Sequence, residues 1–190
     1  WNEEDDEYHK VPQDNIDLYG VLTISNINKY KNRIVYLPKI SLGTGTNMTS
    51  KFSSCFSMVA IPLLDTSRVT NMTSMFQYCY SLVTIPLLDT SKVIYMSNMF
   101  SNCYSLVTIP LLNTNKVTDM NSMFDSCHSL VTIPLLDTTN VTNMTGMFMY
   151  CHSLVTISLL DTNKCTDTSY MFQYCYSLKS IKILNISFEV

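Results

Sequence analysis

Hydrophobic positions recur along most of this chain with a period of 24 residues. The stretch SLVTIPLLDT occurs at 81–90 and again at 129–138, and near copies lie at 105–114 and 153–162. One cysteine marks each repeat: Cys55, Cys79, Cys103, Cys127, Cys151 and Cys175. Self-similarity at a fixed short period is typical of solenoids, in which each repeat is a rung that buries its apolar face against its neighbours.

The first half of each repeat has the spacing of a short buried strand. Leu82, Ile85 and Leu87 follow the pattern L-x-x-I-x-L, which is typical of the leucine-rich-repeat strand. The Ile and the following Leu are two residues apart, so we expect both side chains to point into the core. This inward Leu column comprises Leu63, Leu87, Leu111, Leu135 and Leu159.

A proline lies between these two positions in four repeats, at Pro62, Pro86, Pro110 and Pro134. Proline is excluded from central strands because it has no N–H to donate to the ladder. We therefore expect the ladder of hydrogen bonds to break at the proline, or the strand to end at the Ile.

The second half of each repeat predicts a turn and a short helical segment. Residues 89–92, Asp-Thr-Ser-Lys, are typical of a turn. Met99, Phe100 and Cys103 would share one face of a helical turn. The sequence thus predicts an α/β-type repeat solenoid, a leucine-rich-repeat rod of about six 24-residue rungs, each with one short parallel strand and a short helical turn.

The domain boundary follows from where the repeat begins. Residues 34–40 align with the strand of the next repeat, so we assign 34–190 to the solenoid. Residues 1–33 form an acidic N-terminal arm with a possible capping strand at 21–24. Seven of the first 17 residues are acidic and only Lys10 is basic, which is typical of a solvated arm.

Charge and hydropathy exclude some classes of function. The net charge is only −3, and an acidic column of turn residues accompanies the basic one, so we expect no nucleic-acid partner. No apolar run reaches the roughly 18 residues of a transmembrane segment, and no signal peptide is visible. The chain starts at Trp1, from which we expect that it has been processed or trimmed.

The repeat text CxSLVTIPLLDTSKVTNMxxMFxxC resembles the BspA-like leucine-rich repeats of bacterial surface proteins. Similar repeats occur in mycoplasma surface lipoproteins and in gut bacteria and their phages. The resemblance covers residues 34–190. It implies a right-handed solenoid with strands on the concave side, adhesion or partner binding as the usual role, and no catalytic residue.

The cysteines and histidines offer little chemistry. The column cysteines fit buried free thiols, although disulfides between neighbouring rungs stay open because stacked Cα atoms would be close enough. No C-x-x-C pair is present, and His128 and His152 lack a third ligand, so we expect no metal and no cofactor. A repeat ladder also lacks the unique constellation that catalysis needs, so we expect no enzyme.

A column of rings indicates a candidate binding site. The residue after each cysteine keeps aromatic character but varies in type, which indicates half exposure. The candidate residues are Tyr80, Tyr104, His128, His152 and Tyr176. Stacked rings can contact a protein or a sugar, although a ladder that merely covers the side of the rod is the alternative. A second candidate is the outward strip of Val83, Thr84, Pro86 and their equivalents, as a binding site or a dimer contact.

These observations predict a non-catalytic binding or adhesion module, extracellular or on the cell surface. It would present a repeat surface to a host or bacterial surface protein or glycan. The alternative is a structural or decorating component of a phage virion or another assembly, with neighbouring subunits as partners.

Overall fold

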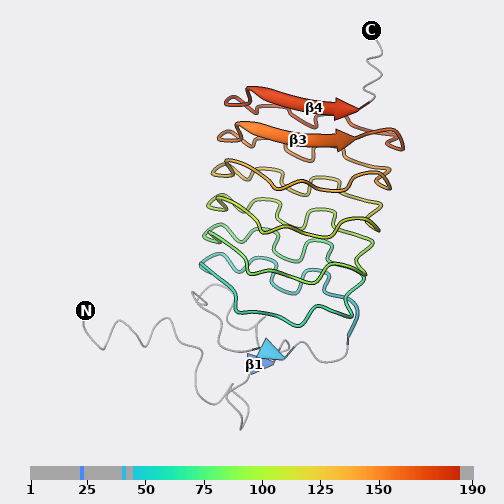
Figure 1. The fold of residues 1–190 in the computed structure, drawn as a ribbon. Helices are drawn as coiled ribbons and strands as arrows, with labels where there is room; N and C mark the ends of the chain where they lie inside the picture. The colour runs from blue at the N-terminus through green and yellow to red at the C-terminus, as the bar shows by residue number, and fades with distance from the viewer. Residues whose placement is uncertain (1–21, 24–39, 42–44, 185–190) are drawn as a thin grey trace, which may run out of the picture.

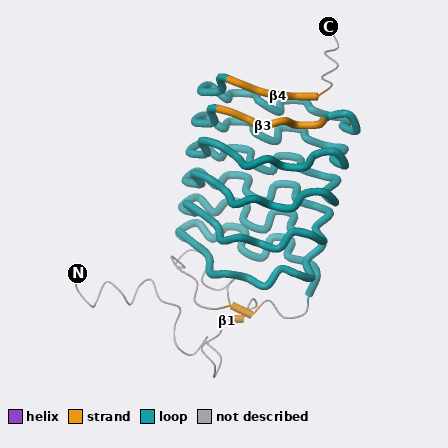
Figure 2. The backbone as a smooth tube through the Cα atoms, viewed as in Figure 1, coloured by secondary structure: helices purple, strands orange, loops and turns teal. Residues whose placement is uncertain are grey.

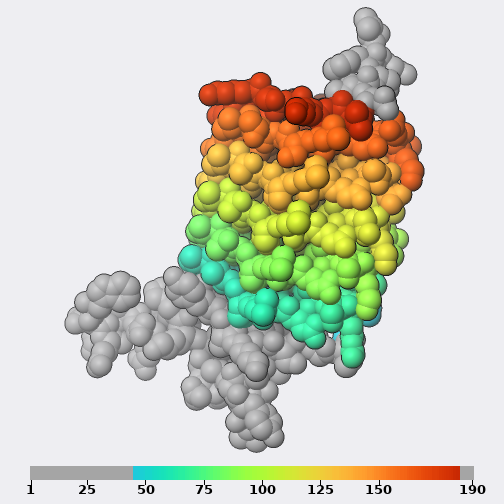
Figure 3. All heavy atoms as spheres, in the orientation of Figure 1, coloured from blue at the N-terminus to red at the C-terminus, as the bar shows by residue number. Residues whose placement is uncertain are grey.

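The computed structural model describes residues 22–23, 40–41 and 45–184, with side chains described from residue 45 to 184. Within the last range the chain winds into rungs stacked along one axis (Figure 1). Parallel bridges link residues 24 apart, in the series Asn47, Asn71, Tyr95, Asp119, Asn143 and Asp167. In the space-filling view each rung is a coloured band, and the bands follow one another in chain order (Figure 3). The predicted repeat solenoid is confirmed.

Four strands occur among the described residues: β1 (Leu22–Thr23), β2 (Ile40–Ser41), β3 (Thr156–Asp161) and β4 (Ser180–Leu184). β1 pairs in parallel with β2, and β3 pairs in parallel with β4. β1 lies within the segment considered above as a capping strand. Most of residues 1–44 lie outside the described ranges, so the boundary between arm and solenoid stays a prediction. The rungs between β2 and β3 are built from loops and turns (Figure 2).

The prolines break the strand ladder, as the sequence predicts. Before the proline, cross-rung bonds form: Val107 N–H donates to Val83 O (3.2 Å), and Val131 N–H donates to Val107 O (3.2 Å). β3, in which Ser158 replaces the proline, extends through this position for six residues, and β4, which has Lys182 there, extends through it as well. Regular strand therefore forms where the backbone N–H needed by the ladder is present.

A bulge changes which leucine enters the core. In the β3–β4 pair, Ile157 lies opposite Ile181 but Leu160 lies opposite Ile183, so β3 has one extra residue between these positions. In the earlier rungs, too, the leucine three residues after the Ile is the buried one, since Leu112 is 2% exposed and its neighbour Leu111 is 63% exposed. The expectation that the Leu63, Leu87, Leu111, Leu135 and Leu159 column points inward is wrong. The inward column is Leu64, Leu88, Leu112, Leu136 and Leu160.

The predicted helical turn is also wrong, because the described residues contain no helix. Within one rung, Met99 N–H donates to Met96 O (3.2 Å) and Cys103 N–H donates to Phe100 O (3.0 Å). Between these bonds, Phe100 N–H donates to Met123 O of the next rung (2.9 Å). Since alternate donors leave for the neighbouring rung, the continuous i to i−4 ladder of a helix cannot form. Asn98 and Asn102, with φ of 55° and 62°, reverse the chain in these turns.

The core is a set of columns that run along the axis. Neighbouring phenylalanine rings from Phe52 to Phe172 stack with centroids 5.4–5.8 Å apart. Methionines beside them are flexible enough to fill the irregular space within each rung. Because each residue packs mainly against the same residue of the next rung, the stack is stabilised by nearest-neighbour contacts.

Six of the seven cysteines form a column, and Cys165 lies outside it. Cys55, Cys79, Cys103, Cys127 and Cys151 are buried, while Cys165 and Cys175 are half-buried, and none of the seven forms a disulfide. Cys103 Sγ donates to Phe76 O of the preceding rung (3.2 Å), and the other column thiols from Cys79 to Cys175 repeat this bond. Burial raises the pKa of Cys103 and Cys127, and it raises that of Cys175 to about 11. The disulfides left open above do not form among these residues.

Candidate functional site

The structure brings all five predicted ring residues together in one ladder on the surface. Centroids are 4.8 Å apart for Tyr80 and Tyr104, 4.7 Å for Tyr104 and His128, and 4.7 Å for His128 and His152. Tyr176 follows at 5.3 Å from His152, and Phe56 extends the ladder at 5.0 Å from Tyr80. We call this column the ring ladder.

Backbone bonds between rungs hold the rings at this spacing. Ser105 N–H donates to Tyr80 O (3.2 Å), and Ser129 N–H donates to Tyr104 O (3.1 Å). Each ring residue directly follows a cysteine of the column, so this column fixes where the ring emerges. The ladder is therefore preorganised by the fold.

The ring ladder presents edges more than faces. Tyr80, His128 and His152 are half-buried, and Tyr104 is 36% exposed, because each inner ring is covered by a nearly parallel ring on either side. Tyr176, at 75% exposed, is the most open of the five. Stacking of a sugar on a ring face is therefore restricted to this end, whereas hydroxyl and imidazole edges line the whole ladder.

A second tyrosine column widens this side of the rod. It consists of the exposed rings Tyr78, Tyr150 and Tyr174, and is interrupted by Asn102 and Ser126 in the two rungs between Tyr78 and Tyr150. Tyr150 stacks on Tyr174 (4.6 Å) and meets His152 edge to face (6.1 Å). Tyrosine offers a large rigid contact area with a polar end, so this side suits recognition of a protein surface.

The electrostatics of the ladder centre on His128 and Asp125. Burial lowers the pKa of His128, and repulsion from His152 lowers it further, while the Asp125 carboxylate opposes both effects. A neutral imidazole has one donor and one acceptor nitrogen. Burial raises the pKa of Asp125, against the hydrogen bond that Ser126 Oγ donates to it (3.0 Å). No group of three or more His, Cys, Asp or Glu among the described residues is placed to hold a metal ion.

A second surface, which the sequence reasoning missed, is a groove along the rod. Its volume is 1270 Å³, and its lining residues come from six successive rungs, from Leu63 to Leu184. One wall is the leucine column that the bulge turns outward, with exposed fractions between 42% and 74%: Leu63, Leu87, Leu111, Leu135 and Leu159. We call it the leucine groove.

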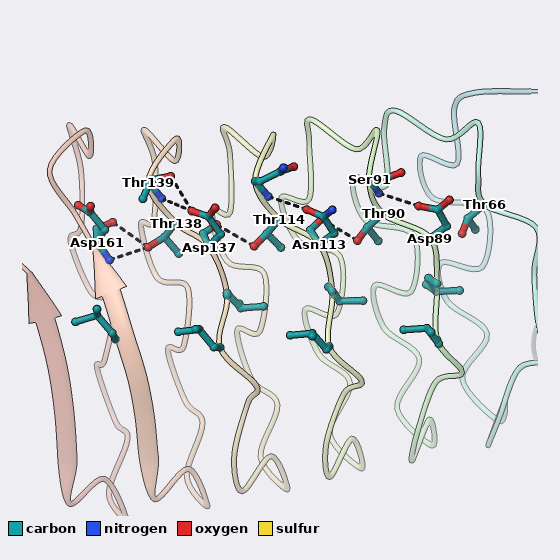
Figure 4. Close-up of a pocket in the computed structure, with 18 of the residues that line it drawn as sticks. Thr66, Asp89, Thr90, Ser91, Asn113, Thr114, Asp137, Thr138, Thr139 and Asp161 are labelled. Atoms are coloured by element: carbon teal, nitrogen blue, oxygen red, sulfur yellow. Dashed lines mark hydrogen bonds between the residues drawn. The ribbon is translucent and has the colours of Figure 1, made fainter.

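The opposite wall is formed by the turns that follow the leucines (Figure 4). Ser91 N–H donates to Asp89 Oδ1 (3.0 Å), and Thr139 N–H donates to Asp137 Oδ1 (3.1 Å). Buried threonine hydroxyls link successive turns, as when Thr114 Oγ1 donates to Asp137 O (2.8 Å). From Thr90 onward these bonds tie each turn to the next, whereas the buried Thr66 hydroxyl in the first turn has no hydrogen-bond partner.

The turn wall carries negative charge. Hydrogen bonds from Ser67, Ser91 and Thr139 hold the pKa of Asp65, Asp89 and Asp137 below the usual range. Arg68 and Lys92 add only smaller contributions to the pKa of Asp65 and Asp89. The carboxyl groups of these three residues are therefore ionised at neutral pH.

The outward strip considered as a second candidate is also exposed. Val83, Val107 and Val131 are each about 40% exposed, and the threonines that follow them are open to solvent, while the prolines are half-buried. The strip precedes the leucine column along each rung, so the apolar surface extends beyond the groove itself.

A stack of 24-residue rungs with inward Leu, Ile and Leu columns defines a leucine-rich-repeat solenoid. The chain belongs to the family described as "Mycoplasma protein of unknown function, DUF285", which matches residues 46–135 and 107–187. This match and the leucine-rich-repeat neighbours below confirm the resemblance to BspA-like repeats. A comparison with curated proteins gives no match.

Solved structures with a similar fold include a leucine-rich-repeat protein of T. pallidum, TpLRR. It has a TM-score of 0.56 and 20% identity, covering 91% of this chain and 81% of that one. A leucine-rich cell surface protein of Faecalibacterium prausnitzii scores 0.37 at 15% identity, covering 87% and 64%. A leucine-rich-repeat protein of Bacteroides ovatus scores 0.28 at 14% identity, covering 86% and 60%. The first of these supports the same fold for this chain. None of the described segments forms a helix of the length and hydropathy needed to cross a membrane.

Proposed function

We propose that this chain is a non-catalytic binding module of the cell surface, which recognises a protein or glycan partner through the ring ladder. The observation that carries the proposal is the continuous, partly exposed stack from Tyr80 to Tyr176. A column that served only as core would be fully covered, as the phenylalanine column is over most of its length.

A protein partner fits the ladder best. The stacked rings present a row of edges, and Tyr78, Tyr150 and Tyr174 broaden that row into a tyrosine-rich face. Tyrosine buries a large area at low entropic cost, so a partner that spans several rungs gains from each one. A glycan would instead use the phenol and imidazole edges, and the open ring of Tyr176.

The repetition argues against catalysis. An active site needs a nucleophile, a base and a stabilising group that converge at one place. The surface groups of this rod recur from rung to rung with little variation, so neighbouring rungs carry the same functional groups at equivalent positions. Binding energy accumulates along such a surface, whereas a reaction centre does not.

The test begins with a glycan array and a pull-down from host cells to find a partner. The double variant Tyr104→Ser with His128→Ser is then compared with the parent chain. We expect binding at least tenfold weaker, because three consecutive ring contacts are lost. Those stacks also stabilise the fold, so circular dichroism must show that the variant is folded at the binding temperature. Tyr104→Phe, which keeps the stack, isolates the hydroxyl.

The matched control is the double variant Ile94→Ser with Tyr95→Ser, since both residues are exposed and lie outside the ladder and the groove. It should bind the partner as the parent does. If the ladder variant is folded and keeps its affinity for the partner, the ring ladder is not the site. The outward strip of Val83, Thr84, Pro86 and their equivalents would then be the candidate binding site. A partner that proves to be another subunit of an assembly would favour a structural role.

A further inference from the structure

We infer that the leucine groove is a docking site for a basic amphipathic α-helix that lies parallel to the axis of the rod. This site is separate from the ring ladder, and the inference does not depend on the function proposed for the ladder. It rests on three properties of the groove: its apolar wall, its repeat distance and its charge.

The apolar wall is too large to be incidental. The exposed fractions of the five leucines add up to three whole leucine residues, and Val83, Val107 and Val131 continue the apolar surface beside them. Contiguous apolar surface of this kind on a soluble protein marks an interaction site. The leucines stand far out of the surface, so an occupant must cover a long open trough, which suits a macromolecular segment better than a small molecule.

The repeat distance favours a helix over a strand. Stacked rings on successive rungs are 4.6–5.8 Å apart in every column of the solenoid. An α-helix rises about 5.4 Å per turn, so a helix along the axis places one apolar side chain on each rung. Side chains on one face of a β-strand repeat at roughly 6.6 Å and would lose register with the leucines within a few rungs.

The charge of the groove selects a basic partner. Asp65, Asp89, Asp137 and Asp161 lie along the turn wall, while Arg68 and Lys92 end the turns of Asp65 and Asp89 outside the residues that line the groove. In each of these turns Oδ1 accepts a hydrogen bond from the backbone N–H two residues further on, and the carboxylate lies at the wall of the groove. Lysines or arginines on one flank of the helix would meet carboxylates at four of the five turns, the exception being the turn that holds Asn113. A second copy of this chain would bring acid against acid.

The test uses a synthetic 18-residue helix with a leucine stripe on one face and lysines on one flank, labelled with a fluorophore. Its binding to the full chain is followed by fluorescence anisotropy at about 0.15 M salt, where exposed charges are screened beyond roughly 8 Å. One control peptide replaces the lysines with glutamates, and another scrambles the leucine and lysine positions. We expect both controls to bind at least tenfold more weakly.

Two variants of the chain locate the site. Leu111→Ser with Leu135→Ser removes two exposed leucines and should weaken binding of the lysine peptide at least tenfold without unfolding the chain. Asp89→Asn with Asp137→Asn should weaken it and flatten its salt dependence. Asparagine is tolerated there, because Asn113 already holds the equivalent turn through a bond from Asn115 N–H (3.3 Å).

The controls separate this site from the ring ladder. Tyr104→Ser with His128→Ser should leave binding of the lysine peptide unchanged, and so should Ile94→Ser with Tyr95→Ser. The inference is overturned if no peptide binds, if the glutamate or scrambled peptide binds equally well, or if the leucine variant binds as the parent does. A concentration-dependent dimer in sedimentation velocity that the leucine variant abolishes would assign the groove to a second copy instead.

Discussion

Two adjacent leucines in the middle of the rod should respond in opposite ways to the same truncation. Leu112 is 2% exposed and lies in the core, while Leu111 is 63% exposed and forms the wall of the leucine groove. The bulge after the Ile position alone decides which of them is buried. Leu112→Ala and Leu111→Ala therefore test the phase of the rung directly.

The magnitudes follow from burial. Truncation of a buried leucine to alanine costs about 2–5 kcal/mol, because transfer energy is lost and a cavity stays behind. Leu111 buries little more than a third of its surface, so the same three carbon atoms are worth about 1 kcal/mol at most. For a chain of 190 residues, each kcal/mol shifts the midpoint of thermal unfolding by roughly 2–4 °C.

Thermal and urea unfolding, both followed by circular dichroism, measure the two variants beside the parent chain. Leu112→Ala should unfold roughly 4–20 °C lower, and Leu111→Ala within about 4 °C of the parent. The reasoning is refuted if Leu111→Ala is the more destabilised of the two, since the inward column would then be the one that the simple period of two predicts.

Three further predictions concern the core and its charges. Phe100→Ala should cost about 3–5 kcal/mol in urea melts, because the ring is fully buried between Phe76 and Phe124; a loss under about 1 kcal/mol would contradict that burial. Cys103 and Cys127 should resist a thiol reagent in the native chain and react after denaturation, since burial keeps both thiols protonated; rapid native labelling would contradict this. Asp125→Asn should raise the melting temperature at pH 7. Burial raises the pKa of Asp125 in the folded chain, so its negative charge destabilises the fold above that pKa. The gain in melting temperature should therefore vanish as the pH falls to 3.8, the pKa in the unfolded chain. A gain in melting temperature that persists below pH 3.8 would contradict the charge argument.

The solenoid could be predicted because the repeat constrains every position several times over. A column that holds Phe at Phe52, Phe76, Phe100, Phe124, Phe148 and Phe172 admits only a stacked core. The ring ladder was predictable for the same reason, since its residues share one place in each rung. The break at the prolines followed from the missing N–H and is borne out by the longer strand at Ser158.

The leucine groove could not be predicted from the period-two rule of a regular strand. Proline interrupts the ladder after Ile85, the chain takes in one extra residue, and Leu88 replaces Leu87 as the inward side chain. The sequence did contain a signal of the bulge. In the final rung, which lacks the proline, the apolar residues Ile181 and Ile183 are two positions apart. In the earlier rungs a second leucine lies three positions after the Ile. The helical turn failed for a related reason, since hydrogen bonds to the next rung compete with bonds inside the segment.

The equal length of the rungs makes both surfaces extensible in whole steps. Removal of one 24-residue unit, such as 97–120, would join Met96 to Asn121 in the same phase and leave every column continuous. The shortened chain would lose one ring from the ladder, and one leucine and one turn from the groove. Duplication of the unit would add the same set. Gain or loss of a unit therefore changes the number of equivalent contacts that the chain offers. The size of the partner that fits and the avidity would change in steps of one rung, while the chemistry of each contact stays constant.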